Sequence, residues 1–153
     1  MSKINYIIGD ATYPIGTVNK VIVHVCNDIG AGFVLALSRR WKEPEESYRK
    51  MKNRDLGQVE FVRVSQDIIV ANMIAQHNVG YDENGEPPIR YKELRRTLKK
   101  VNDYCIITDS TMHMPRIGCG LAGGDWEYVE KIIQAVVTVP VYVYDLSIKY
   151  TKR

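Results

Sequence analysis

The sequence predicts an α/β protein in which a mixed β-sheet lies between layers of helices. Strand-like and helix-like segments alternate along the chain in the order β-β-α-β-β-α-β-α-β. The run Lys20–Cys26 is apolar and β-branched, which is typical of a strand buried on both faces. Two turns that contain glycine each join a strand to a helix. Strands separated by helices of this length favour a layered α/β fold over a separate all-β or all-α one.

The N-terminal half begins with two predicted strands and continues with helices. Lys3–Ile8 alternates weakly between polar and apolar residues and ends in Gly9-Asp10, which indicates a first strand and its turn. After the second strand and a turn, the helical spacing of apolar residues predicts a helix over Gly32–Trp41. Pro44 can open a further helical stretch over Glu45–Met51.

The rest of the chain contains four more predicted strands and two helices. The strands are Gln58–Val64, Asp67–Ala75, Thr111–Pro115 and Val139–Tyr144. The segment His77–Pro88 is rich in glycine and proline and predicts a loop. An amphipathic helix follows over Tyr91–Cys105, and another begins near Asp125, which we expect to be its N-cap. Pro140 indicates that the last strand lies at an edge of the sheet or that the proline is at an early position in it.

Length and composition predict one domain over residues 1–153. With 45% apolar and 25% charged residues, the 17.5 kDa chain has the composition of a soluble globular protein that can bury a core. The first residues carry no charged segment followed by an apolar one, so no secretion signal is predicted. Three cysteines without a C-x-x-C pair indicate a reducing compartment rather than a disulfide framework or a structural zinc site. We therefore expect a cytoplasmic protein.

The net charge of +3 does not by itself predict a nucleic-acid partner. Basic residues do recur at helical spacing opposite Leu94, Leu98 and Val101. They are Lys92, Arg95, Arg96, Lys99 and Lys100. This pattern has two interpretations, a solvated helix face or a surface that attracts an anionic and even polymeric partner.

The strongest local signal is Met114–Trp126, where a strand leads into four glycines within seven residues and a helix follows at once. Glycine lets backbone N–H groups approach a ligand closely, and a helix N-terminus favours anions. A turn with a purely structural role is expected to need only about one or two glycines. We therefore predict a phosphate site at the carboxyl end of this strand. The turn matches neither the Walker sequence nor G-x-G-x-x-G after a first strand, which argues against an ordinary nucleotide triphosphatase.

A second turn, Asn27–Gly32, also joins a strand to a helix. Two such turns suit a ligand with two ends, such as a diphosphate that carries two riboses. Asn27 and Asp28 offer amide and carboxylate groups for sugar hydroxyls, or they form only an Asx-type turn that caps the helix. Asp10 either accepts a hydrogen bond from an adenine amino group or only fixes its own turn.

Three segments of the chain together resemble the macrodomain family. Gly9–Thr12 (Gly-Asp-Ala-Thr) is similar to the family motif whose aspartate binds the adenine amino group. The Asn27–Phe33 segment resembles the loop around the distal ribose, and Met114–Trp126 is similar to the diphosphate loop. The resemblance implies a three-layer α/β/α fold with a central mixed, mostly parallel sheet of about six strands.

The phrases His24–Trp41 and Ala71–Gln76 resemble a bacterial and phage subgroup of one macrodomain branch. That branch contains terminal ADP-ribose protein glycohydrolase and the antitoxins that remove ADP-ribose from DNA. The resemblance extends from about Tyr6 to Asp145 and implies a site for ADP-ribose. The residues expected to contact it are Asp10, Ala11, Asn27, Gly30, Ala31, Gly32, Phe33, Gly118, Cys119, Gly120, Leu121, Ala122, Gly123 and Tyr144.

Two catalytic residues of this branch have no counterpart here. The related glycohydrolases use a lysine in the loop after the fourth strand, which here reads Ala75-Gln76-His77-Asn78. Some members carry an aspartate directly after Gly-Cys-Gly-Leu, where this chain has Ala122. Other macrodomains hydrolyse ADP-ribosyl esters with a water activated by the substrate's own diphosphate, and such a site needs orientation and an electrostatic cradle.

The candidates for catalysis are therefore Asp28 first and His77 second, with Asn27 beside them. Instead of catalysis, Asp28 could serve in ribose binding or turn capping. The alternative for His77 is that it is an exposed loop histidine without a function. We do not favour covalent catalysis by Cys119 with His113, because glycine-flanked turns usually present their backbone. His24 and Cys26 share a strand face but lack a third metal ligand at suitable spacing, so no metal is predicted.

The first functional hypothesis is an ADP-ribosyl hydrolase that acts on ADP-ribosylated acidic side chains or O-acyl-ADP-ribose and needs no cofactor. The second is a reader that binds ADP-ribose without turnover, and the third is a phosphatase for ADP-ribose 1″-phosphate. We expect the partner to be ADP-ribose or an ADP-ribosylated protein, with ADP-ribosylated nucleic acid as the alternative. We expect a monomer that binds no membrane.

Overall fold

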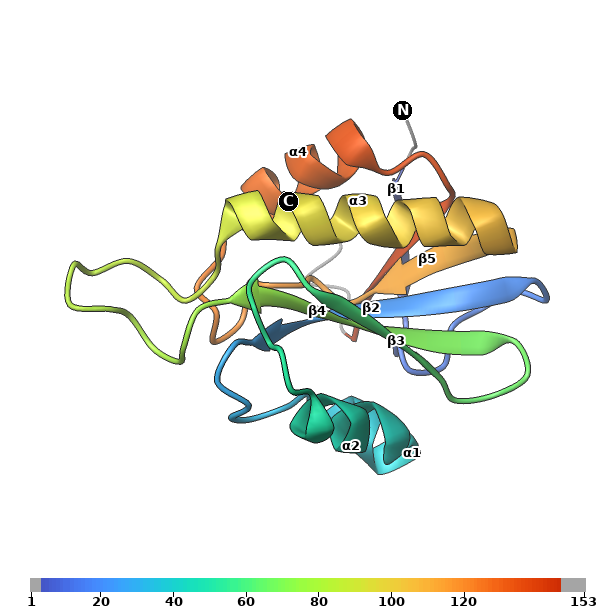
Figure 1. Cartoon of the computed structure of the whole chain (residues 1–153). Coiled ribbons are helices and arrows are strands. Elements are labelled where there is room, and N and C mark those ends of the chain that lie inside the picture. The colour runs from blue at the N-terminus through green and yellow to red at the C-terminus, as the bar shows by residue number, and fades with distance from the viewer. Residues whose placement is uncertain (1–3, 147–153) are drawn as a thin grey trace.

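A computed structural model describes residues 4–146, which form a six-stranded sheet with helices on both faces (Figure 1). The strands are β1 (Ile4–Ile8), β2 (Asn19–Asn27), β3 (Val59–Arg63), β4 (Ile68–Gln76), β5 (Ser110–Met114) and β6 (Val141–Asp145). The helices are α1 (Leu35–Arg40), α2 (Glu43–Lys50), α3 (Tyr91–Thr108) and α4 (Trp126–Val136). Lys3, with which the first predicted strand begins, lies outside the described residues.

The sheet is mixed and mostly parallel, as the sequence predicts. Its strand order is β1-β6-β5-β2-β4-β3, and β3 pairs antiparallel with β4 while all other neighbours are parallel. The β2 strand lies between β5 and β4, and its residues from Lys20 to His24 are all buried. The predicted burial of this strand on both faces is therefore confirmed.

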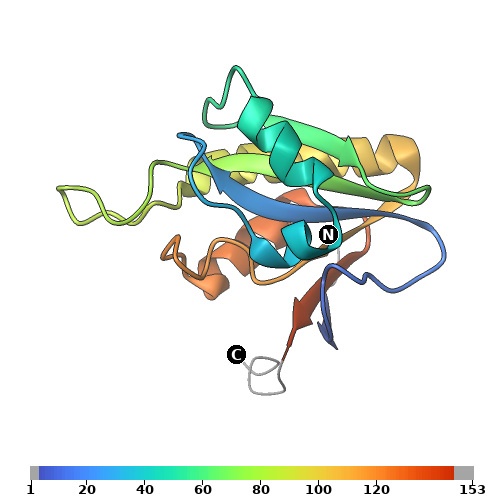
Figure 2. The same ribbon diagram turned by 90° about the horizontal axis from the view of Figure 1, so that it is seen from below.

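The helices form two layers that differ in size. Helices α3 and α4 cover one face of the sheet, and α1 and α2 cover the other (Figures 1 and 2). The apolar stripes of α3 and α4 supply Leu94, Leu98, Val129 and Ile133 to the main core, where each is fully buried. On the other face, two smaller clusters form around Leu37 of α1 and around Tyr48 of α2 with Cys26 and Ile74.

Helix α1 begins later than the sequence predicts. Gly32 has a φ of +68°, and the residues between it and Leu35 are irregular, so the predicted helical segment from Gly32 is a loop for three residues. Helix α3 in turn extends past Cys105 and ends where Asp109 adopts a left-handed conformation with a φ of +52°.

The structure tests the predictions that concern Asp125 and Pro140. Asp125 is the N-cap of α4, and its carboxylate accepts a hydrogen bond from the Glu127 N–H at 3.0 Å, as predicted. Strand β6 is not an edge strand, because it pairs with both β1 and β5. Pro140 lies directly before β6, where its missing N–H costs no ladder hydrogen bond and its carbonyl accepts from Met112.

The carboxyl ends of the five parallel strands meet at one edge of the sheet, and the loops that follow them gather there. The loop of residues 77–88, after β4, extends farthest from this edge, at the left of Figure 1. Within the described residues, no helix is both long and apolar enough to cross a lipid bilayer. The loops at the carboxyl edge are where ligands of open α/β sheets bind.

Candidate functional site

Two adjoining cavities open at the carboxyl edge of the sheet. The larger, of about 510 Å³, lies between the segments that follow β2, β4 and β5. The smaller, of about 120 Å³, is bounded by the segments after β1 and β6 and shares His24, Val34 and Pro115 with the larger one. Because the two cavities share a wall, they suit one elongated ligand better than two separate ones.

The glycine turn after β5 closes on itself and leaves a row of free amides. The Gly118 carbonyl accepts a hydrogen bond from the Gly124 N–H at 2.7 Å, and the Gly120 carbonyl accepts from the Gly123 N–H at 3.0 Å. In the part of the chain that the structure describes, no protein acceptor meets the N–H groups of residues 119–122. Successive free amides of this kind form a cradle for an anion.

Three of the four glycines in this turn are required by its own geometry. Gly118 and Gly123 have φ values of +73° and +75°, which strain any residue with a side chain. A Cβ on Gly124 would lie 2.4 Å from the Gly118 carbonyl oxygen. The expectation that a structural turn needs only one or two glycines is therefore wrong. Gly120 is different, because its φ is ordinary and a Cβ on it would meet nothing within 4 Å.

The Asn27 side chain orders the turn after β2 through its hydrogen bonds. Its Oδ1 accepts hydrogen bonds from the Ile29 and Ala31 N–H groups at 3.1 and 3.2 Å and from the Tyr48 hydroxyl at 2.6 Å. Its Nδ2 donates to the Ala31 carbonyl. Burial raises the pKa of Tyr48 to about 12, so this hydroxyl stays protonated and donates. Of the two alternatives for Asn27, the structure supports the Asx-type turn.

The two candidate acid–base residues contact each other. His77 Nδ1 lies 2.7 Å from Asp28 Oδ2, and the Asn78 N–H donates to Asp28 Oδ1 at 2.7 Å. The Asp28 side chain is 16% exposed and that of His77 is 50% exposed. Neither lines the cavity, but each directly follows a lining residue, Asn27 or Gln76. The pair therefore lies at the rim of the larger cavity.

Asp10 and Tyr144 line the smaller cavity. Asp10 Oδ1 accepts from the Thr12 N–H at 2.9 Å and from the Thr12 hydroxyl at 2.8 Å, so this carboxylate does fix its own turn. The Tyr144 hydroxyl accepts from the Ile15 N–H at 3.0 Å and lies 2.8 Å from His113 Nδ1. Both side chains are thus held in place beside the cavity.

The buried histidines and Cys119 are poorly suited to acid–base or nucleophilic work. Burial lowers the pKa of His24 and of His113 to about 4, so both imidazoles are neutral near pH 7. Burial also raises the pKa of the Cys119 thiol to about 11, and this thiol donates to the Ile117 carbonyl at 3.3 Å. Among the described residues, no group of three or more His, Cys, Asp or Glu side chains could hold a metal ion.

Several residues that line the larger cavity are not among the contact residues predicted from the sequence. They are His24, Val25, Cys26, Val34, Gln76, Val79, Gly80, Pro115, Arg116 and Ile117. Arg116 forms a bidentate ion pair with Asp145, at 2.8 and 3.0 Å, and its guanidinium lies 5.3 Å from the ring centres of Tyr6 and Trp126. Its place directly before the glycine turn was the only sequence signal for it.

Solved structures resemble nearly the whole chain. A protein of unknown function from Bacteroides thetaiotaomicron is 52% identical, with a TM-score of 0.91, over 95% of this chain and 99% of its own. A macrodomain protein from Streptomyces coelicolor is 42% identical, with a TM-score of 0.79, over 94% of this chain and 99% of its own. The macrodomain of Mycobacterium tuberculosis DarG shares the fold, with 22% identity and a TM-score of 0.72 over 96% of this chain and 100% of its own.

The curated relatives align with this chain only in part. Mouse chromodomain-helicase-DNA-binding protein 1-like is 32% identical over 94% of this chain, but the chain spans only 18% of that protein. Bovine ADP-ribose glycohydrolase OARD1 is 43% identical over 49 residues, which are 30% of this chain and 31% of that protein. No family model matches the sequence.

Proposed function

This chain belongs to the macrodomain family, and on that premise we propose that it binds ADP-ribose in the two adjoining cavities and hydrolyses ADP-ribosyl linkages. The substrates that we propose are ADP-ribosylated acidic side chains and O-acyl-ADP-ribose. The observation that carries the proposal is the row of free amides at residues 119–122, three of which lie in the wall of the larger cavity. A diphosphate is the part of ADP-ribose that such a row would hold.

Neighbouring walls of the two cavities would bind the other parts of ADP-ribose. The smaller cavity, with Asp10 and Tyr144, would take the adenine, since its walls are mostly apolar. The turn of residues 27–32 would take the distal ribose, because Asn27, Ala31 and Gly32 line the larger cavity. The bond to be cleaved would therefore lie near the rim where Asp28 and His77 meet.

Asp28 and His77 would activate the water. If the His77 Nδ1–H donates to Asp28 Oδ2, Nε2 carries a free lone pair that can accept a proton from water. The water oxygen then bonds to the anomeric carbon of the distal ribose, and the bond from that carbon to the acyl oxygen breaks. The products are ADP-ribose and the free carboxylate, and the proton rests on His77.

The test is a single-turnover assay on a glutamate-ADP-ribosylated protein, with calorimetry on free ADP-ribose beside it. Asp28→Asn should keep the affinity for ADP-ribose and lower the release rate by about 100-fold, the usual effect of removing a general base or its partner. His77→Gln should do the same. Asp55→Asn, an exposed carboxylate change outside both cavities, is the matched control and should leave both quantities unchanged.

A reader without turnover is the second candidate, and two observations favour it. Neither Asp28 nor His77 lines the cavity, and the loop after β4 has no lysine. Binding of ADP-ribose without release from the modified protein would support the reader. Failure to bind ADP-ribose at all would contradict both candidates.

A further inference from the structure

His24 provides the polar side chain in the wall that the two cavities share. Among the described residues, only His24, Val34 and Pro115 line both cavities, and the side chains of Val34 and Pro115 are apolar. His24 lies in β2 and is 2% exposed. A ligand that occupies both cavities must pass this wall, and His24 is the residue there whose side chain can form a hydrogen bond with it.

Asn72 determines which nitrogen of the His24 ring carries the hydrogen. The Pro44 carbonyl can only accept a hydrogen bond, so the end of the Asn72 amide that faces it, at 3.0 Å, is Nδ2. The other end of the same amide, Oδ1, lies 2.5 Å from His24 Nε2. Because an amide oxygen can only accept, Nε2 must carry a hydrogen and donate it. Asn72 is fully buried, so water does not compete for either bond.

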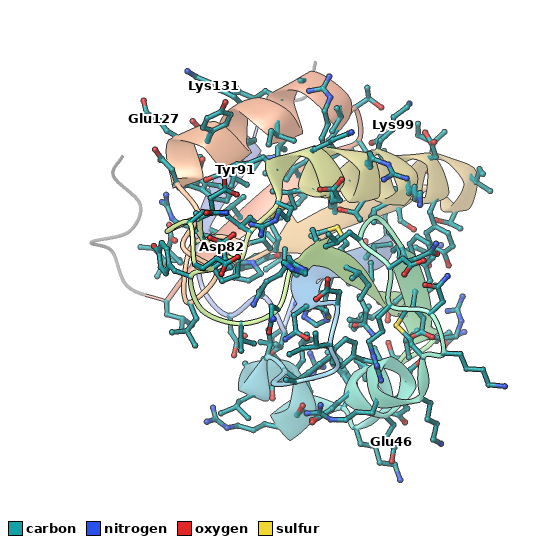
Figure 3. The ribbon with its side chains drawn as sticks, turned by 60° about the vertical axis from the view of Figure 1, so that its left-hand side comes forward. Glu46, Asp82, Tyr91, Lys99, Glu127 and Lys131 are labelled. Atoms are coloured by element: carbon teal, nitrogen blue, oxygen red, sulfur yellow. The ribbon has the colours of Figure 1, made fainter. Side chains whose placement is uncertain are left out.

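The neighbours of His24 hold its ring in one orientation. Asn72 lies directly opposite His24 in the register of β2 and β4, and its bond to Pro44 ties both strands to the first turn of α2. Pro44 is buried in that turn, whereas Glu46 lies on the outer side of α2 in Figure 3. The rings of Phe33 and His24 meet edge to face, with their centres 4.8 Å apart. The imidazole is therefore oriented before a ligand binds.

The second ring nitrogen, Nδ1, is left as a hydrogen-bond acceptor. Burial lowers the pKa of His24 to about 4, so near pH 7 the ring is neutral and carries one hydrogen, on Nε2. In the described part of the chain, the only hydrogen-bonding group that meets Nδ1 is the Cys26 thiol, whose sulfur lies 3.9 Å away. A thiol is a weak donor, so a hydroxyl group of a ligand would be a better partner for this nitrogen.

We propose that His24 Nδ1 accepts a hydrogen bond from a hydroxyl group of the adenosine ribose, and that the site therefore requires an ADP-ribose in which this hydroxyl is free. This inference rests on the proposed function, which assigns the adenine to the smaller cavity and the diphosphate to the amides of residues 119–122. The adenosine ribose joins these two parts, so it must lie at the shared wall. A ribose oxygen that is bonded to a phosphate or to a further sugar has no hydrogen to donate and would leave Nδ1 without a partner.

The test is a thermodynamic cycle that combines changes in the ligand with changes in the whole protein. Calorimetry measures the affinity for ADP-ribose and for its 2′-deoxy and 3′-deoxy analogues, each altered in the adenosine ribose. The proteins are the unaltered chain, His24→Phe and His113→Phe. His113→Phe is the matched control, because it also removes a buried, neutral imidazole, from the neighbouring strand β5, but His113 lines neither cavity.

One of the two deoxy ligands should bind to the unaltered protein about 5- to 50-fold more weakly than ADP-ribose, since it leaves a buried acceptor unpaired. His24→Phe should bind ADP-ribose more weakly and should no longer distinguish it from that deoxy ligand. His113→Phe should retain the full preference for ADP-ribose, whatever its overall affinity. A merely structural role of His24 would lower all affinities together and leave their ratios unchanged.

Nitrogen-15 NMR of the unaltered protein gives a second measurement that does not depend on the folding of His24→Phe. The His24 ring, assigned through its own backbone amide, should show a hydrogen on Nε2 and none on Nδ1 at pH 7. Saturation with ADP-ribose should shift the Nδ1 signal, and saturation with the weaker deoxy ligand should shift it less. A hydrogen on Nδ1 of His24 would exclude the proposed acceptor.

The inference and the proposed function fail in different ways. If ADP-ribose binds and both deoxy ligands bind equally tightly, the contact with His24 is refuted and the ADP-ribose site remains. The same conclusion follows if His24→Phe keeps the affinity ratios of the unaltered protein. If none of the three ligands binds to the unaltered protein, the proposed function itself is wrong.

Discussion

Gly120 and Gly124 allow the role of the glycine turn to be divided into a structural part and a ligand-binding part. Both belong to the same turn, and each would gain one methyl group on substitution by alanine. A Cβ on Gly124 would lie 2.4 Å from the Gly118 carbonyl oxygen, which is also the acceptor of the Gly124 N–H. A Cβ on Gly120 would meet no protein atom within 4 Å, yet Gly120 lines the larger cavity.

The expected magnitudes follow from this difference. Gly124→Ala should destabilise the protein by about 2–4 kcal/mol, because the overlap costs about 1–3 kcal/mol and the hydrogen bond to Gly118 adds about 1 kcal/mol. Gly120→Ala should leave the stability unchanged or raise it by up to about 1 kcal/mol through the unfolded state. The same methyl group should weaken ADP-ribose binding by about 10- to 100-fold, because a hydrogen bond to a charged group is worth about 1.5–3 kcal/mol.

Urea denaturation of the ligand-free proteins gives the stabilities, and calorimetry with ADP-ribose gives the affinities. A Gly120→Ala variant that binds ADP-ribose as tightly as the unaltered protein would refute the assignment of the diphosphate to the amides of residues 119–122. A Gly124→Ala variant as stable as the unaltered protein would refute the steric argument for that position.

Three further predictions concern residues around the cavities. Tyr48→Phe removes the hydroxyl that donates to Asn27, so urea denaturation should show a loss of about 1–2 kcal/mol and calorimetry a weaker affinity for ADP-ribose. The unfolded chain binds protons at His24 and His113 from about pH 6.5 downward, whereas the folded chain does so only near pH 4. The free energy of unfolding, measured by urea denaturation, should therefore be undiminished above pH 6.5. It should fall between pH 6 and 4, by up to about 1.4 kcal/mol per pH unit for each histidine. Cys119→Ser should leave any release of ADP-ribose within about twofold, and iodoacetamide should alkylate Cys119 slowly, because its pKa of about 11 keeps the thiol protonated.

Each of these predictions has a control or a contradicting result. Tyr142→Phe keeps the ring that stacks on His113 and removes a hydroxyl outside the cavities, so it should cost less stability than Tyr48→Phe. A stability that stays level down to pH 5 would contradict the neutral, buried state of His24 and His113. If the Cys119→Ser variant no longer released ADP-ribose, the result would support covalent catalysis by Cys119, which the raised pKa of its thiol argues against.

Much of the fold follows from patterns that are local in the sequence. The β-branched run Lys20–Cys26 predicts a strand buried on both faces, and β2 lies between β5 and β4. Asp125, directly before an apolar stripe at helical spacing, predicts the N-cap of α4. Both predictions succeed because burial of a strand and capping of a helix are set by residues within a few positions of each other.

The start of α1 shows where local pattern was insufficient. Phe33, Val34 and Leu37 have helical spacing, but Gly32 adopts a left-handed conformation, and the chain does not become helical until Leu35. The Asn27 side chain accepts hydrogen bonds from the backbone N–H groups two and four positions further along the chain, and these bonds form a turn before Gly32. The left-handed backbone of Gly32 cannot belong to a right-handed α-helix, and the spacing of apolar residues does not report the backbone conformation of a glycine.

The sequence by itself determined the class of the fold, the glycine turn after β5 and the identity of Asp28 and His77 as candidates. It did not determine that these two side chains meet, since they lie 49 positions apart. A register shift between Cys26 and Asn27 sets Asn27 opposite Gln76, and the Asp28 N–H then donates to the Gln76 carbonyl at 3.0 Å. Only the tertiary structure decides this pairing, because the register of two parallel strands depends on packing across the whole sheet, whereas turns and helix caps depend on neighbours in the chain.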